Sequence, residues 1–501
     1  MACWCDGKCP HLAAPAAVFR AGHQAQAGAM LRRIIAENPG CGEAHMLFAH
    51  VLQETNHASF AVPHMDTAQE ILGPLPRVLG NKANVMRNAV RLPAAIAAAR
   101  EAVTAAPDNP MCWAMLADHL QAEGATDEMA DTMRQAAAKF GRRHPGLRRM
   151  VAVACMELKD TAGALDALAG DGLSELDLFE RGRALETAGA FPEAWRDWMA
   201  AKAMQRARGC NWNRGEAETR FAMLADGARP RRLAGIPRAD LAAGAQPVFI
   251  CGQPRSGTTM IEAALSAHPR IAGGDEMMML PDLLQIMPAL LQTNAPYPLS
   301  LGALRCADSA IIPNLMRDFY LRKAAAKIGG AKPAATWFTD KMPSNELHWP
   351  LLGLLFPESP IIATRRHPLD VVVSNMAHHL VHGGFISCSL EGFAANFAMV
   401  SRLLDHYRKS LPWLKVRTVP YEKLVADHRA GIDALLPPGA EPDSRCYDFH
   451  LSPWKSRTIS HRQIKKPVND KSVGRWRNFA DFLKPVLEDL RPIMEGQGYG
   501  L

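Results

Sequence analysis

The residues with the clearest chemical meaning form a glycine-containing loop, Gly252-Gln-Pro-Arg-Ser-Gly-Thr-Thr259. Its two glycines have the spacing of the phosphate-binding P-loop, but Thr258 stands where that motif has its lysine. The missing lysine would reach the terminal phosphates of a triphosphate, whereas Arg255 offers a planar fork of donors from inside the loop. The loop therefore predicts a phosphate site that differs from an ordinary site for a magnesium-bound triphosphate.

The segments on either side place this loop between a strand and a helix. Residues 248–251 are a short apolar run typical of a buried strand, and residues 259–266 have the apolar spacing of a helix. In this arrangement free backbone N–H groups and the positive end of the helix converge on one anion. A strand-to-helix turn that binds nothing is the alternative, but an arginine and three hydroxyls beside two glycines favour an anion site.

Further motifs follow the loop, and together they resemble a known family. They are Pro254–Thr259, Ala267–Pro269, Gly274–Glu276, Arg366–Ser374 and Gln463–Trp476. Over residues 245–480 the chain resembles the sulfotransferases that use 3′-phosphoadenosine-5′-phosphosulfate (PAPS), most of all tyrosylprotein sulfotransferases and their bacterial relatives with tetratricopeptide repeats. The resemblance implies transfer of a sulfuryl group from PAPS to a hydroxyl acceptor, with no metal required.

The resemblance also implies which residues bind the donor. The 5′-phosphosulfate would be bound by the loop residues Arg255, Ser256, Gly257, Thr258 and Thr259. Further contacts with the nucleotide would come from Arg366, Ser374, Tyr421, Ser460 and Arg475. Among these, Arg366 and Ser374 would hold the 3′-phosphate at the start of a helix. A tyrosine at the end of a strand is as often part of the core, so both interpretations of Tyr421 stay open.

Catalytic roles are implied for four residues. Glu276 matches the general base of the family, and an acceptor phenol, with a pKa of about 10, needs such a carboxylate to take its proton. Lys341 matches a lysine that stabilises charge at the bridging oxygen, and Ser460 matches a serine that assists the leaving group; Arg255 belongs here through its contact with the phosphosulfate. The alternatives are a solvated acidic turn for Glu276 and a salt bridge to Asp340 for Lys341.

The first part of the chain has a different pattern. Residues 12–225 are rich in alanine and have helical apolar spacing almost throughout. Prolines recur near the predicted helix junctions, and the intervals 110 − 76 = 34 and 145 − 110 = 35 are close to the 34-residue period of a tetratricopeptide repeat. Such repeats stack into a solenoid with a concave surface for a peptide or protein. The alternative is a helical domain that only packs on the catalytic half.

The composition turns to Pro, Gly and Arg around residues 227–232 and 242–247, and we place the linker there. The predicted architecture is an all-helical, tetratricopeptide-like repeat domain over residues 1–235. An α/β, P-loop-like sulfotransferase domain with a parallel central sheet is predicted over residues 236–501.

Strands and helices alternate in this second domain. Residues 336–339, 360–364 and 415–419 are short apolar runs, each leading into a polar or helical stretch, which favours a parallel sheet. Ligands of such sheets lie beyond the carboxyl ends of the strands. Arg255, Lys341, Arg366 and Tyr421 are all expected at such ends.

The composition of the 501 residues is that of a folded globular protein, and 57 basic against 50 acidic residues is too weak an excess to indicate nucleic acid as a partner. No apolar run reaches 18 residues and the N-terminus lacks the pattern of a signal peptide, which predicts a cytoplasmic protein with no membrane contact.

Eleven cysteines without framework spacing favour reduced thiols. Near the N-terminus Cys3, Cys5, Cys9 and His11 have ligand types that suit a soft metal, although a frayed terminus explains them as well, and the predicted site includes no metal. His378 and His382 have the i, i+4 spacing of metal ligands on a predicted helix, but the carboxylate pattern of a metalloprotease is missing.

Two other functions fit parts of this pattern. A nucleotide-dependent kinase with a variant P-loop would bind ATP with magnesium, which Thr258 argues against. A non-catalytic repeat scaffold would keep the nucleotide site without the transfer reaction. The acceptor stays open: the repeats favour a peptide or protein tyrosine, but fold-level likeness cannot distinguish it from small alcohols, lipids or sugars.

Overall fold

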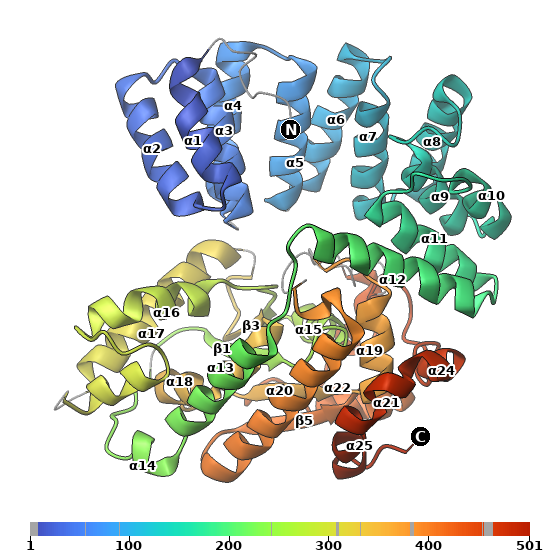
Figure 1. Ribbon diagram of the computed structural model, residues 1–501. Helices are drawn as coiled ribbons and strands as arrows, with labels where there is room; N and C mark the ends of the chain where they lie inside the picture. Colours follow the sequence, from blue (N-terminus) through green and yellow to red (C-terminus); the bar gives the residue numbers. More distant parts are fainter. Residues whose placement is uncertain are drawn as a thin grey trace. The chain divides into compact units, whose positions relative to one another are not determined.

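The computed structural model describes residues 9–500 except 56, 90, 242, 307–309, 331, 381–384, 453 and 455–463. Contacts divide the chain into two compact units, Met1–Ala190 and Phe191–Leu501 (Figure 1). Helices α12 (Phe191–Ala207) and α13 (Arg214–Gly227) belong to the second unit and pack against its other elements. The domain boundary at residue 235, placed by composition, stays a prediction.

The first unit consists of helices that pack in chain order. Each packs on the next from α1 to α11, and the odd-numbered helices α3, α5, α7 and α9 also pack on one another. The starts of α3, α5 and α7 are separated by 76 − 42 = 34 and 110 − 76 = 34 residues, which is the period of a tetratricopeptide repeat. The predicted repeats are therefore confirmed. The helices are α1 (Ala13–Arg20), α2 (Gln24–Glu37), α3 (Gly42–Glu54), α4 (Ala58–Leu72), α5 (Pro76–Asn88), α6 (Leu92–Ala105), α7 (Pro110–Glu123), α8 (Thr126–Phe140), α9 (Arg148–Glu157), α10 (Thr161–Ala167) and α11 (Glu175–Thr187).

The turn before α7 shows how the sequence starts these helices. Asn109 caps the helix by accepting a hydrogen bond from the backbone N–H of Met111 at 3.0 Å. Pro110 occupies the first helical position, where its missing N–H costs nothing and its fixed φ suits the helix. Fully buried alanines such as Ala99 and Ala117 let neighbouring helices approach closely.

A parallel sheet of five strands lies in the second unit, as predicted. Its order is β2-β3-β1-β4-β5, so β1 is central. The three predicted strands after β1 are found within one or two residues, and only the two-residue β2 was not foreseen. The strands are β1 (Gln246–Cys251), β2 (Ile271–Ala272), β3 (Trp337–Lys341), β4 (Ile361–Arg365) and β5 (Val416–Pro420).

Both faces of the sheet are buried. On β1, Phe249 and Cys251 face one apolar core, while Val248 and Ile250 face the other. The other helices of the second unit are α14 (Pro230–Leu233), α15 (Thr258–Ala267), α16 (Met279–Leu290), α17 (Ile311–Ile328), α18 (Trp349–Leu355), α19 (Pro368–Met376), α20 (Leu390–Ser410), α21 (Tyr421–Ala426), α22 (His428–Asp433), α24 (Ala480–Leu483) and α25 (Leu487–Gly496). A continuous apolar run on β1 follows from burial on both faces.

Among the helices of the described residues, none is both long and apolar enough to cross a membrane.

Candidate active site

Predicted site residues follow the carboxyl ends of the strands in the order of the sheet. In that order they are Glu276 after β2, Lys341 at the end of β3, the loop 252–257 after β1, Arg366 after β4 and Tyr421 after β5. Because the strands are parallel, all these ends lie at one edge of the sheet, where ligands of such folds bind.

The loop after β1 can adopt its shape only with glycine at two positions. Gly252 has φ of 148° and Gly257, the N-cap of α15, has φ of 101°. A Cβ at position 257 would lie 2.5 Å from Cδ2 of Tyr421, and one at position 252 would lie 2.1 Å from Oγ1 of Thr364. Arg255 itself has φ of 71°, a conformation that is uncommon outside glycine and is concentrated at functional sites.

Three arginines, Arg255, Arg366 and Arg475, form what we call the arginine cluster. Arg255 donates from Nε to Oγ of Ser374 at 3.1 Å, and its carbonyl accepts from Nη1 of Arg366 at 3.0 Å. Burial, followed by the charges of Arg366 and Arg475, lowers the pKa of Arg255 to about 10. Like charges held this close favour a multiply charged anion among them.

Asp370, which sequence reasoning did not single out, organises this cluster. It is fully buried in α19, and its two carboxylate oxygens accept the backbone N–H groups of Gly474 and Trp476, each at 2.8 Å. The residue between those two is Arg475, so Asp370 fixes the backbone that carries this arginine. Asp370 also lies 3.9 Å from Arg366. Its position four residues after Arg366 was the available signal, but it indicated only a local ion pair.

Tyr421 belongs to the same region. Its ring lies under the guanidinium of Arg366, 4.8 Å from the ring centre, and its hydroxyl hydrogen-bonds the side chain of Ser472 at 2.9 Å. Arg366 also donates to the carbonyl of Ser472. These contacts, rather than the core interpretation, account for Tyr421, and Ser472 is a further neighbour that the sequence did not indicate.

A second group of charges, which we call the acidic cluster, lies at the ends of β2 and β3. It contains Glu262, Asp275 and Glu276 around Lys341, whose Nζ lies 2.8 Å from Oε1 of Glu276 and 3.3 Å from Oδ1 of Asp275. Glu262 accepts the backbone N–H of Asp275 and the hydroxyl of Thr339, both at 2.8 Å. Glu276 is therefore held by Lys341 while keeping 29% of its side chain exposed.

Burial and the neighbouring charges together set the charge states of this cluster. Burial alone would lower the pKa of Lys341, but Asp275, Glu276 and Glu262 outweigh it and raise the pKa, so this lysine stays charged. Burial raises the pKa of Glu262 to about 8, against the charge of Lys341. Asp340, the alternative partner of Lys341, instead accepts hydrogen bonds from Tyr320 at 2.5 Å and Asn345 at 3.1 Å.

The remaining predicted residues are placed as follows. Ser256 is buried and its hydroxyl hydrogen-bonds that of Thr364, while Thr258 and Thr259 are the first residues of α15. Ser460 lies outside the described residues. The helix predicted to carry His378 and His382 is wrong as far as it is described, because α19 ends at Met376; His382 also lies outside the described residues.

The arrangement suits an anion that carries phosphate groups. The loop that carries Arg255 leads directly into the first turn of α15, and Nε of Arg366 is a buried donor with no hydrogen-bond partner among the described residues. A buried, unmatched guanidinium nitrogen is costly unless an anion accepts from it. Arg255, Arg366, Ser374 and Arg475 would hold such a group.

The second unit is similar to known sulfotransferases. Residues 247–437 match the model of the sulfotransferase family. An uncharacterized protein of Aquifex aeolicus is 27% identical over 49% of this chain and 32% of its own length. Protein-tyrosine sulfotransferase 1 of Danio rerio is 24% identical over 46% of this chain and 65% of its own length. The chain thus spans less than two thirds of either relative.

Among solved structures, the sulfotransferase domain of the Synechococcus PCC 7002 olefin synthase is 20% identical, with a TM-score of 0.36, and the match covers 53% of this chain and 99% of that domain. The matched region 247–437 contains the loop, Glu276, Lys341 and Arg366, whereas Arg475 lies beyond it. Residues 247–437 thus match the sulfotransferase family, in a chain whose first unit consists of tetratricopeptide-like repeats.

Proposed function

We propose that the second unit transfers a sulfuryl group from PAPS to a hydroxyl acceptor, with Glu276 as general base. The observation that carries this proposal is the pairing of two opposite charge clusters at neighbouring strand ends in a sulfotransferase-family domain. When bound, the donor supplies an activated sulfuryl group on a phosphate leaving group. This chemistry needs positioning, charge stabilisation and removal of one proton.

The two clusters divide these tasks. The arginine cluster binds and orients the phosphates, and Ser374 supports Arg255 in that role. The carboxylate of Glu276, which is part-exposed, takes the proton of the acceptor hydroxyl. Lys341, kept charged by its carboxylate neighbours, can donate a hydrogen bond to an oxygen on which negative charge develops. No step of this proposal requires a metal, which agrees with Thr258 in place of the P-loop lysine.

A tyrosine of a peptide or protein is the acceptor that we propose first. The relative from Danio rerio is named a protein-tyrosine sulfotransferase, and repeat units of this kind offer a surface for peptides. With this acceptor, we expect the enzyme to act on a peptide or protein in the cytoplasm.

The test is a calorimetric titration of the purified chain with 3′,5′-adenosine bisphosphate without magnesium, beside Mg-ATP. We expect tight binding of the bisphosphate, weakened by about 10–100-fold in an Arg366→Ala variant because the arginine cluster is broken. Preference for Mg-ATP would instead support a kinase. Tight bisphosphate binding without transfer of labelled sulfate to tyrosine peptides or to any acceptor of an extract would support a non-catalytic scaffold.

A further inference from the structure

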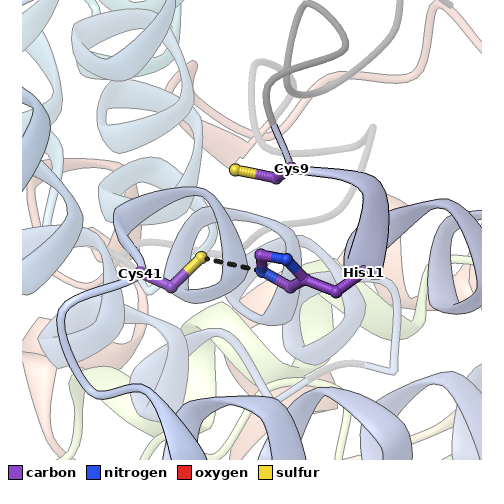
Figure 2. Close-up of side chains that lie close together, drawn as sticks. All are labelled: Cys9, His11 and Cys41. Carbon is purple, nitrogen blue, oxygen red and sulfur yellow. Dashed lines mark hydrogen bonds between the residues drawn. The ribbon is translucent and has the colours of Figure 1, made fainter.

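The N-terminal end of the helical unit brings together two thiols and an imidazole. Cys9 immediately precedes the short 3-10 helix η1 (Pro10–Leu12), His11 lies within it, and Cys41 is the N-cap of α3. Nε2 of His11 is 3.4 Å from Sγ of Cys41, and one ligand atom from each of the three residues lies within 4.8 Å of the others. Figure 2 shows the Cys9 side chain next to the His11–Cys41 pair.

These distances and atom types fit a metal ion. Zinc binds thiolate at about 2.3 Å and imidazole at about 2.0–2.1 Å in a tetrahedron, which places sulfur about 3.6 Å from nitrogen and about 3.8 Å from a second sulfur. Two thiolates and an imidazole favour zinc over magnesium, calcium or manganese, which prefer oxygen ligands.

We propose that Cys9, His11 and Cys41 bind one zinc ion, which fastens the N-terminal segment to the first helices of the repeat unit. The ligands come from segments 30 residues apart, so the ion would close a loop that contains α1 and α2. Binding replaces the thiol protons of Cys9 and Cys41, which leave to solvent, so zinc occupancy should fall as the pH is lowered.

A structural role follows from where this site lies. Each repeat of a solenoid contacts only its neighbours, so the first helices depend on few packing partners. Leu12, next to His11, is only 1% exposed and packs in one core cluster with Leu31, Cys41 and Leu47. An ion that holds η1 over this cluster would stabilise the folded unit, because it binds the folded arrangement and not the unfolded chain.

The test is metal binding by the full chain, kept reduced with a phosphine and stripped with a chelator. We expect about one equivalent of Zn²⁺ per chain on elemental analysis after reloading. Co²⁺ should give the thiolate charge-transfer and tetrahedral d–d bands of a mixed sulfur and nitrogen site. Both signals should be lost in Cys9→Ser and Cys41→Ser variants and weakened in His11→Ala.

Matched controls come from the same unit. Cys112→Ser replaces a buried cysteine in α7, and Cys155→Ser replaces a half-buried cysteine in α9. Both variants should keep the metal. Circular dichroism of each apo variant shows whether the helices still form.

Two results would overturn the proposal. One is zinc and cobalt binding that is equal in the wild type and in the Cys9→Ser/Cys41→Ser double variant. The other is a Cys9–Cys41 disulfide in protein prepared without reductant, combined with no metal uptake after its reduction. Neither result bears on the sulfotransferase proposal, because the site lies in the other unit.

Discussion

The arginine cluster and the acidic cluster lie on opposite sides of the central strand β1, and they differ in how their charges are balanced. In the acidic cluster Lys341 contacts carboxylates directly, at 2.8 Å and 3.3 Å. In the arginine cluster the carboxylate of Asp370 accepts hydrogen bonds from backbone N–H groups and lies 3.9 Å from Arg366. One side is thus organised around an internal ion pair, and the other is organised to receive an anion.

Removing the base on the acidic side should have the largest effect on turnover. In a Glu276→Gln variant the acceptor keeps its proton, so we expect kcat to fall by about 10²–10⁴-fold. The affinity for 3′,5′-adenosine bisphosphate should stay close to that of the wild type, since the arginine cluster is untouched. Single-turnover transfer from labelled PAPS and calorimetry measure the two quantities.

Glu422→Gln is not a suitable control, because Glu422 accepts the backbone N–H of His367 beside Arg366. Glu488→Gln, on an exposed position of α25, is suitable and should leave both quantities unchanged. Equal losses of turnover and nucleotide affinity in Glu276→Gln would mean that Glu276 supports the site and is not its base.

Breaking the arginine cluster should reverse this pattern. Arg366→Ala removes charge-assisted hydrogen bonds worth about 1.5–3 kcal/mol each, so bisphosphate affinity should fall by about 10–100-fold. Arg366→Lys keeps the charge but not the planar fork, and it should recover only part of the loss. Calorimetry at two salt concentrations measures the affinity and its electrostatic share; an unchanged affinity in Arg366→Ala would contradict the role of this cluster.

A smaller change should follow from loosening the support of this cluster. Asp370→Asn replaces one of two acceptor oxygens by an NH₂ group, which leaves a buried backbone N–H of Gly474 or Trp476 unmatched. We expect bisphosphate affinity to fall by about 10-fold through displacement of Arg475.

A steady-state assay distinguishes this positioning role from a general loss of folding. In Asp370→Asn the KM for the donor should rise more than kcat falls, whereas partial unfolding would lower kcat alone. Asp481→Asn, an exposed acid on α24, is the matched control. A fall in kcat with the donor KM unchanged would argue against positioning.

The two clusters also differ in how much of them could be predicted from sequence. Strand ends and loop glycines follow from local patterns, so the positions of Arg255, Lys341 and Arg366 relative to the sheet were predictable. The partners of Asp370 lie more than 100 residues away, at separations of 104 and 106, and only the folded chain brings them together. A local reading of Asp370 could suggest no more than its neighbour Arg366.

The same limit applies to the other contacts that were missed. Glu262 stands in a helix of apolar and small residues, which marks it as unusual, but its partners are Asp275 in the segment after β2 and Thr339 within β3. Cys41 was not grouped with Cys9 and His11, because 30 residues and two helices separate them in the chain. Long-range pairs of this kind depend on tertiary packing and leave no periodic signal.

The last expected effect is on stability, with no change predicted in turnover or nucleotide affinity, and it arises from the pH titration of Glu262. In the folded protein this carboxyl stays protonated up to a pKa of about 8, because of its burial, whereas in the unfolded chain it ionises at an ordinary glutamate pKa of about 4.3. Between these values the folded state binds the additional proton, so stability falls as the pH rises through this window and levels off above it. Glu262→Gln removes the titrating group, and the stability of this variant should therefore decline less over the same window.

The measurement is the thermal midpoint of the transition that 3′,5′-adenosine bisphosphate shifts, followed from about pH 5 to about pH 9. Because the nucleotide shifts only the transition of the unit that binds it, this midpoint reports that unit alone. Asp340→Asn is the informative control, since burial raises the pKa of Asp340 only to about 6 and its contribution should end near that pH. Parallel pH profiles for the wild type and Glu262→Gln would mean that Glu262 is ionised in the folded protein, and that the acidic cluster carries one more negative charge around Lys341 than we infer.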